Sequence, residues 1–279
     1  MTHPRLSLSF VALVALVALP RVAGANPRPL PFTYTAQTLP EGEVELEQYV
    51  DMTPVKALEI PSGEVAPILA TALQTEFEYG ITDKLELGLY ASFAPKPGSF
   101  AGVPDLLWKN GLKQRLRYRL ADPGEWPVDV AVYGEVAEMQ EEIEVEGKVI
   151  LERRFGDLRI ATNLWAEREF HLDKPEQAWV LNPTLGMTYQ VTPVVHPGLE
   201  GWMRVEFEDE EEEEAGKPEP PREFNAGPHA YVGPTMLLSF GQFWWSTGVY
   251  VRATDFGRSA TVGDAYGAIW ARTIIGVGL

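Results

Sequence analysis

Apolar and polar residues alternate along most of the chain from Glu43 onward. The segment 106–120 has two clearly different faces, with Trp108, Leu112, Leu116, Tyr118 and Leu120 opposed by Lys109, Lys113, Arg115, Arg117 and Arg119. A period of two is typical of β-strands that have one apolar and one polar face. The sequence therefore predicts an all-β protein.

The alternating segments follow one another with regular interruptions. We expect twelve strands, at 43–52, 68–79, 85–94, 106–120, 128–138, 143–153, 158–170, 178–190, 194–208, 225–238, 243–252 and 266–279. Many reach the roughly 9–11 residues of a tilted strand that crosses a membrane. Short turns and longer loops alternate between them, except for the short connection at 139–142. This layout predicts a transmembrane antiparallel up-and-down β-barrel over 43–279, with both termini on the short-turn, periplasmic side.

The first 25 residues have a different character. Arg5 precedes an apolar run from Leu6 to Leu19, and the small residues Ala23-Gly24-Ala25 follow. The run is too short for a membrane-spanning helix, which needs about 20 residues, and its flanks are those of a secretory signal. We expect a signal peptide at 1–25, cleaved after Ala25, and an N-terminal periplasmic segment at 26–42. No later apolar run could form a transmembrane helix, so a membrane location requires a barrel.

Aromatic residues gather near the predicted turns. They are Tyr79, Tyr118, Trp126, Tyr189, Phe240, Phe243, Trp244 and Trp245. Each alone could be part of a core, but rings at strand ends favour a girdle at the membrane interface.

Composition excludes several functions. The formal charge of −17 disfavours nucleic acid, which is bound by clustered Lys and Arg. The absence of cysteine excludes disulfides, thiolate metal ligands, thiol catalysis and an N-terminal lipid anchor.

Charged residues on the polar faces of the strands are the candidate functional residues. We expect the lumen to be lined by Lys109, Lys113, Arg115, Arg117, Arg119, Glu76, Glu78, Glu135 and Glu167. Further acids on polar faces are Glu45, Glu47, Glu86, Glu169 and Glu206. Charges in a confined interior need partners, so structural pairing is favoured over a selectivity filter, although the two roles are compatible.

No catalytic, cofactor or metal site is predicted. The run 206–214 is nearly all acidic but lacks the glycine-containing spacing of a calcium loop, so we expect a solvated loop. His171, His196 and His229 have no serine two residues later, which disfavours a hydrolase centre on one strand face without excluding a triad across strands.

Two stretches carry a family resemblance. Residues 31–49, starting Pro31-Phe32-Thr33-Tyr34, and the hairpin 78–88 around Thr82-Asp83-Lys84 resemble a bacterial outer-membrane family assigned to a phenol-degradation pathway. The resemblance extends over 31–279. It implies an outer-membrane barrel that passes small or hydrophobic molecules, and it implies no catalytic residues.

The sequence thus predicts a passive outer-membrane channel or transporter for small or hydrophobic molecules, without a cofactor. Its partners would be outer-membrane lipid, the barrel-assembly machinery and a small-molecule solute. Two alternatives remain: a lipid-modifying enzyme on a barrel, and a soluble periplasmic β-barrel that binds a ligand.

Overall fold

The structure, a computed structural model, describes residues 25–59, 62–94, 100–101, 110–172, 177–208, 228–254 and 266–279. These residues form fourteen strands and no helix that is long and apolar enough to cross a membrane. The strands are β1 (Val44–Glu59), β2 (Val65–Thr82), β3 (Leu85–Phe93), β4 (Phe100–Ala101), β5 (Gly111–Arg119), β6 (Asp129–Met139), β7 (Glu142–Phe155), β8 (Leu158–His171), β9 (Gln177–Leu181), β10 (Thr184–Tyr189), β11 (Val195–Glu208), β12 (His229–Phe240), β13 (Phe243–Arg252) and β14 (Ile269–Gly278).

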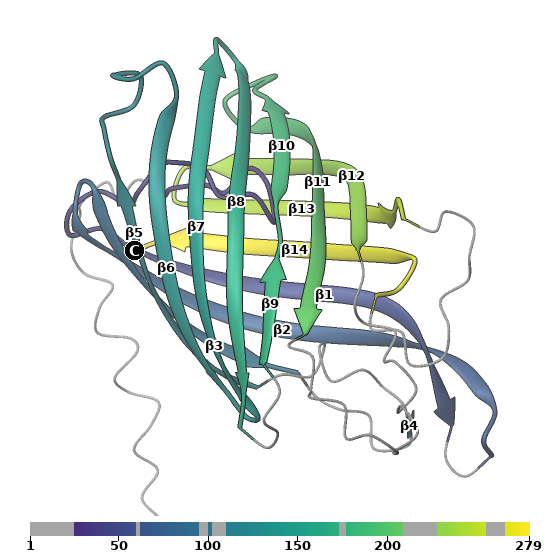
Figure 1. Ribbon diagram of the computed structural model, residues 1–279. Coiled ribbons are helices and arrows are strands. Elements are labelled where there is room, and N and C mark those ends of the chain that lie inside the picture. Colours follow the sequence, from purple (N-terminus) through teal and green to yellow (C-terminus); the bar gives the residue numbers. More distant parts are fainter. Residues whose placement is uncertain are drawn as a thin grey trace, which may run out of the picture.

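The strands close into an antiparallel barrel (Figure 1). Apart from β4, β9 and β10, strands that follow one another in the chain pair with each other, and β14 pairs with β1 to close the ring. Both β9 and β10 pair with β8 on one side and β11 on the other, so they are two halves of one interrupted strand. The two-residue β4 pairs only with the end of β1. The wall therefore has twelve strand positions, as predicted.

Most strand boundaries differ from the prediction by a few residues, and two larger differences involve proline. The hairpin of β1 and β2 continues through the expected loop at 53–67, with Pro54 opposite Leu69. The pairing of β1 with β14 ends at Met52 and that with β4 begins at Leu58, so Pro54 lies on an edge where a residue without an N–H is tolerated. The predicted strand 178–190 is broken between β9 and β10, at Asn182 and Pro183.

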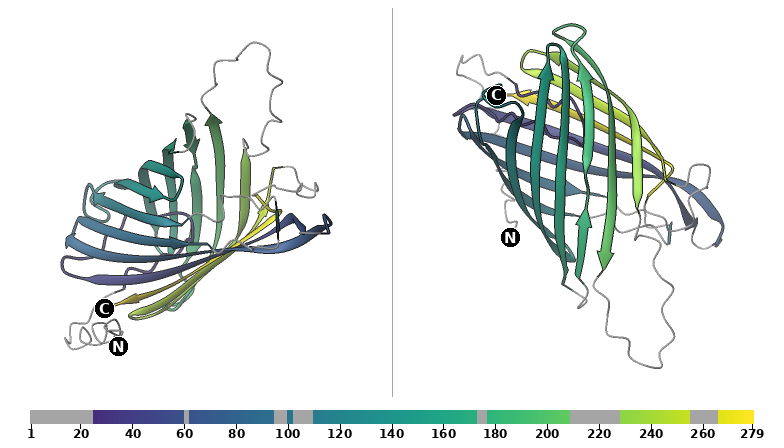
Figure 2. Two further views of the ribbon diagram at one scale, coloured as in Figure 1. Left: turned by 90° about the horizontal axis from the view of Figure 1, so that it is seen from below. Right: turned by 45° about the horizontal axis from the view of Figure 1, so that its top comes forward.

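The strands curve around a common interior (Figure 2). Polar side chains on their inward faces are buried, and many large apolar side chains are exposed on the outside. On β8, Asn163, Glu167 and Glu169 are buried, whereas Leu164 is 56% exposed. Neighbouring strands share the arrangement, with outward Leu116, Leu185 and Leu199. A water-soluble ligand-binding barrel would bury its apolar face and expose its polar one. The outer surface of this barrel is instead apolar, as a lipid-facing wall requires.

The outer surface also carries the predicted aromatic girdle. Seven of the eight residues are exposed near the short turns: Tyr79, Tyr118, Trp126, Tyr189, Phe240, Phe243 and Trp245. The prediction was wrong for Trp244, which is fully buried. The pleat of β13 turns Trp244 inward between two outward aromatic residues, and its indole N–H donates to Glu45.

The apolar outer wall gives a testable expectation. Leu164 lies in the middle of β8 and faces outward, whereas Leu172 follows the end of that strand and is also exposed. An arginine at the bilayer midplane of a barrel costs about 2–4 kcal/mol, against about 0–1 near the interface. We therefore expect Leu164→Arg to destabilise the barrel in lipid vesicles far more than Leu172→Arg, as measured by denaturant unfolding. Equal effects would argue against a membrane-spanning wall.

Candidate functional site

The N-terminal segment runs through the interior of the barrel instead of beside it. We call residues 26–39 the strap. The strap is drawn in purple in Figure 1. Its side chains Leu30, Phe32, Tyr34 and Leu39 are all buried. The sequence predicted a periplasmic segment at 26–42, and the structure differs because the inward polar faces of the wall offer partners to the strap's backbone.

Five wall side chains bind the backbone of the strap. An extended segment that joins no sheet needs other partners for its buried N–H groups. Glu45 accepts from Asn26 N (2.7 Å), Glu200 from Phe32 N (3.0 Å) and Thr33 N (2.6 Å), Asn163 from Tyr34 N (2.7 Å), Glu152 from Ala36 N (2.9 Å) and Glu86 from Leu39 N (2.7 Å). Asn163 also donates to Tyr34 O at 3.0 Å. These acceptors lie on β1, β11, β8, β7 and β3, so the strap is attached around much of the barrel.

Two glycines of the wall leave room for the strap and the turn that follows it. A Cβ at Gly186 of β10 would lie 2.6 Å from Leu30 Cδ1. At Gly80 of β2, it would lie 1.9 Å from the carbonyl oxygen of Pro40. The backbone at Pro40 cannot move aside as a flexible side chain can, so the wall at Gly80 is shaped to the bound segment.

Arg115 is the centre of the charge network beneath the strap. Its guanidinium contacts Glu86 at 2.6 Å and Glu76 at 2.6 Å and also pairs with Glu78. Its Nε donates to Tyr90 Oη at 2.7 Å, and the side chain is fully buried. Arg117 adds a bond of 2.7 Å to Glu86. Of the residues predicted to line the lumen, this network brings together Arg115, Arg117, Glu76 and Glu78 as ion pairs.

The strap contributes a cation of its own to this network. Arg28 lies 3.6 Å from Glu47 and 3.9 Å from Glu76, and it donates to Tyr49. Its guanidinium carbon is 3.4 Å from the centre of the Tyr34 ring. The strap is therefore held by charge as well as by backbone hydrogen bonds.

A second network lies nearer the loop end of the barrel. Lys113 Nζ is 3.3 Å from Glu135 and 3.2 Å from Glu144, and Arg204 is 3.7 Å from Glu167 and 2.6 Å from Glu169. The predicted residues Lys113, Glu135 and Glu167 belong here. At the opposite end, Arg119 donates to Asp83 O and contacts Asp122 beside the short turns. Lys109 lies outside the described residues.

Aromatic side chains surround the middle of the strap. The Phe32 ring lies 4.7 Å from Trp202, 5.2 Å from Tyr250 and 6.4 Å from Trp270, measured between ring centres. Arg272 covers the ring at 3.8 Å and is itself held by Asp51 at 2.8 Å. Tilted and edge-on rings with a cation over one face are favourable arrangements, so Phe32 is the apolar anchor of the strap.

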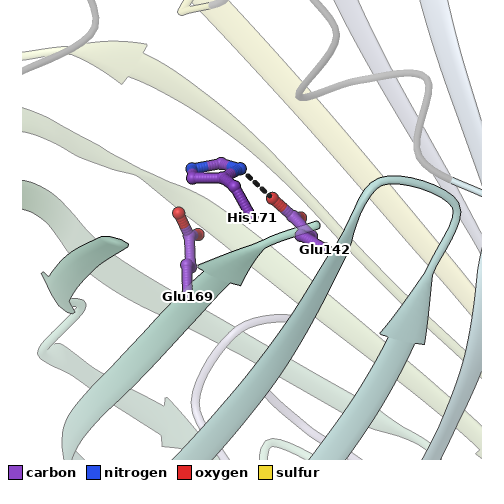
Figure 3. Close-up of side chains that lie close together, drawn as sticks. All are labelled: Glu142, Glu169 and His171. Carbon is purple, nitrogen blue, oxygen red and sulfur yellow. Dashed lines mark ion pairs between the residues drawn. The ribbon is translucent and has the colours of Figure 1, made fainter. Parts of the chain in front are cut away.

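Three groups of side chains have spacings that could suit a metal ion. One contains Glu142, Glu169 and His171, in which His171 Nδ1 lies 3.6 Å from Glu142 (Figure 3). The others are Glu144 with Glu167 and Glu169, and Glu45 with Glu47 and Glu78. Their carboxylates also contact Lys113, Arg204, Arg115 and a strap N–H, so these contacts explain the clusters without an ion.

The other residues singled out in the sequence lie apart from one another. His171 is on β8 and His229, on β12, stacks on Tyr266. His196 is half-buried and its ring lies beside Pro193 O. Of the acidic run 206–214, Glu206 and Glu208 belong to the end of β11, and residues 209–214 lie outside the described part of the chain.

Sequence patterns missed several residues that hold the strap. Asn163, Glu152 and Glu200 each sit on a strand's inward face, and the period of two identifies that face. Nothing in the sequence separates an acceptor for a strap N–H from a member of an ion pair. The buried Trp244 was missed because it lies between two exposed aromatic residues.

The fold is similar to solved outer-membrane channels and porins. An outer-membrane channel from Pseudomonas putida F1 matches with a TM-score of 0.59 and 10% identity, covering 88% of this chain and 98% of that one. The NanC porin matches with a TM-score of 0.50 and 8% identity, covering 84% of this chain and 98% of that one. No family model and no curated protein sequence matches the chain. The likeness shows the fold, and the phenol-degradation family stays a prediction.

The Arg115 network predicts a large stability effect. Arg115→Gln would leave three buried carboxylates without their shared cation, and breaking a buried ion pair costs about 3–5 kcal/mol. Lys84→Gln is the matched control, because Lys84 pairs with exposed Asp122 at the surface, where ion pairs contribute about 0–1 kcal/mol. Denaturant unfolding in detergent or vesicles measures both. A loss in Arg115→Gln no greater than in the control would contradict the central role of Arg115.

Proposed function

We propose that the protein is an outer-membrane channel for small molecules, and that the strap occupies its lumen in the closed state. The observation that carries the proposal is the inverted barrel: an apolar outer wall surrounds an interior of charged and hydrogen-bonding side chains. Such an interior suits a path for polar solutes through lipid. The likeness of the fold to outer-membrane channels supports this function and the location it requires.

The strap fills the interior where solutes would pass. Leu30 and Leu39 have no exposed surface, and the wall residues Glu86, Asn163 and Glu200 that bind the strap are at most 1% exposed. Side chains around an open water-filled lumen would be accessible to water. Passage therefore requires the strap to move, which makes it the gate of the proposed channel.

The balance of interior charge favours cations over anions. Carboxylates clearly outnumber Lys and Arg among the buried side chains of the described residues. The excess is concentrated on β7 and β8, in Glu142, Glu144, Glu146, Glu167 and Glu169. Rings of acidic side chains are the common device of cation-selective pores. The proposed solutes are accordingly small and neutral or positively charged.

Purification and reconstitution test the function directly. We expect the protein to fractionate with the outer membrane, to shift its mobility on heating before electrophoresis, and to make liposomes permeable to small neutral solutes. Empty liposomes and liposomes with heat-unfolded protein are the controls. Folded protein that admits no solute would refute the channel, and phospholipid hydrolysis by the same sample would favour the enzyme alternative.

A disulfide can test the gate, because the chain contains no cysteine of its own. Leu30→Cys with Gly186→Cys places a thiol on the strap beside one on β10, where the side chain of Leu30 meets Gly186. We expect the oxidised double variant to lower liposome permeability well below that of its reduced form. The two single variants control for the effect of the reductant. Equal permeability before and after reduction, with the disulfide confirmed by mass spectrometry, would show that the strap is not the gate.

The excess of acid predicts ion selectivity. Glu144→Gln with Glu167→Gln removes two negative charges from the inner face of β7 and β8, so the preference for cations should fall. The matched control is Glu64→Gln, which changes an exposed residue of the β1–β2 turn. Reversal potentials in a salt gradient measure the selectivity. An unchanged potential in the double variant would assign these carboxylates to structural pairing alone.

A further inference from the structure

We propose that Glu45 binds the α-amino group of the processed chain. Asn26 N lies 2.7 Å from Glu45 Oε2. The small-residue pattern Ala23-Gly24-Ala25 predicts cleavage directly before this nitrogen. Hydrolysis adds water across the peptide bond, so Ala25 leaves with a carboxylate and Asn26 keeps the nitrogen as an ammonium group. A neutral N–H donor would thereby become a cation at the same position.

The surroundings of Glu45 need such a cation. Its side chain is fully buried, and its Oε1 accepts the neutral indole N–H of Trp244, at 2.7 Å. Carboxylate oxygens of Glu45, Glu47 and Glu78 lie within 4.8 Å of one another.

The neighbouring acids already have their own partners. Arg28 lies 3.6 Å from Glu47, and Arg115 pairs with Glu78. Within the described part of the chain, Glu45 makes no ion pair with Lys or Arg. A buried carboxylate without a counter-charge is costly, and the ammonium group of Asn26 would supply that charge.

The position of the pair gives it a role in holding the strap. Ala25 lies at the mouth of the barrel, where its Cα would be 3.3 Å from a Cβ on Gly278. The other end of the segment is fixed at Gly42, whose N–H donates to Gly80 O at 2.8 Å. The ion pair would hold the free N-terminal end of the strap, whereas the C-terminal end is held by its covalent connection to β1. Processing would then complete the seating of the strap.

Labelling of the amine tests this proposal on the full protein isolated from the membrane. Mass spectrometry first identifies the N-terminal residue, which we expect to be Asn26. An amine-reactive ester applied near neutral pH favours the α-amine, because its ordinary pKa of about 7.7–8.0 is well below that of lysine. We expect the amine of the folded protein to react about tenfold more slowly than that of the unfolded protein, the factor that one pKa unit represents.

Variants separate the ion pair from burial in general. Glu45→Gln should raise the labelling rate of the folded protein towards the unfolded rate, whereas Glu41→Gln, at an exposed position beyond the strap, should not. Glu45→Asp keeps the charge but shortens the side chain by one methylene, and it should also raise the rate. It serves as the second test where Glu45→Gln does not fold, as judged by heat-dependent mobility.

Three results would overturn the proposal. They are an N-terminus other than Asn26, equal labelling of folded and unfolded wild-type protein, and folded Glu45 variants that label at the wild-type rate. The proposal does not depend on the channel function, since labelling requires no solute passage. An impermeable protein with a protected amine would refute the channel alone, and a permeable protein with an unprotected amine would refute the ion pair alone.

Discussion

The requirement that buried polar groups find partners governs the interior of this barrel. An outer wall that faces lipid must be apolar, and the two-residue period of a strand then turns the polar side chains inward. Twelve strands enclose a narrow space in which these side chains cannot all be hydrated. They bind one another and the strap instead. The strap's amides need acceptors and the inward carboxylates need donors, so each satisfies the other.

Charge within this interior is arranged around few cations. Arg115 serves three carboxylates at once, and the planar guanidinium is suited to this because it offers several donors in fixed directions. Gly88 makes this position possible, since a Cβ there would lie 2.6 Å from Arg115 Nε. The carboxylates of β7 and β8 are served by Lys113 and Arg204, which leaves an excess of acid nearer the loop end. The excess of acidic side chains over basic ones thus lies nearer the loop end of the barrel than the short-turn end.

The sequence predicted the strands of the barrel wall far better than the strap and the ion pairs inside it. A period of two and regularly spaced turns are local properties, and they gave the strand order, the closed ring and both ends on the short-turn side. The strap alternates too, at Leu30, Phe32 and Tyr34, but it joins no strand. Its acceptors Glu152, Asn163 and Glu200 lie more than a hundred residues away in the chain. Prolines misled in both directions: Pro54 lies within a strand that was expected to end before it, whereas Pro183 lies in a break within a strand that was expected to be continuous. The ladder of basic residues on β5 was visible, but its partners could be assigned only once register was known.

Because wall carboxylates hold the strap through its backbone N–H groups, release of the strap depends on other donors that can take their place. When the strap leaves, its acceptors Glu86, Glu152 and Glu200 lose their N–H donors, and water or a solute must satisfy them. The same carboxylates that hold the gate closed would then line the path. A solute with N–H or ammonium donors satisfies them better than one with acceptors alone, so it competes with the strap for these positions. The carboxylates released by the strap would therefore add to the selectivity that the acidic residues nearer the loop end provide.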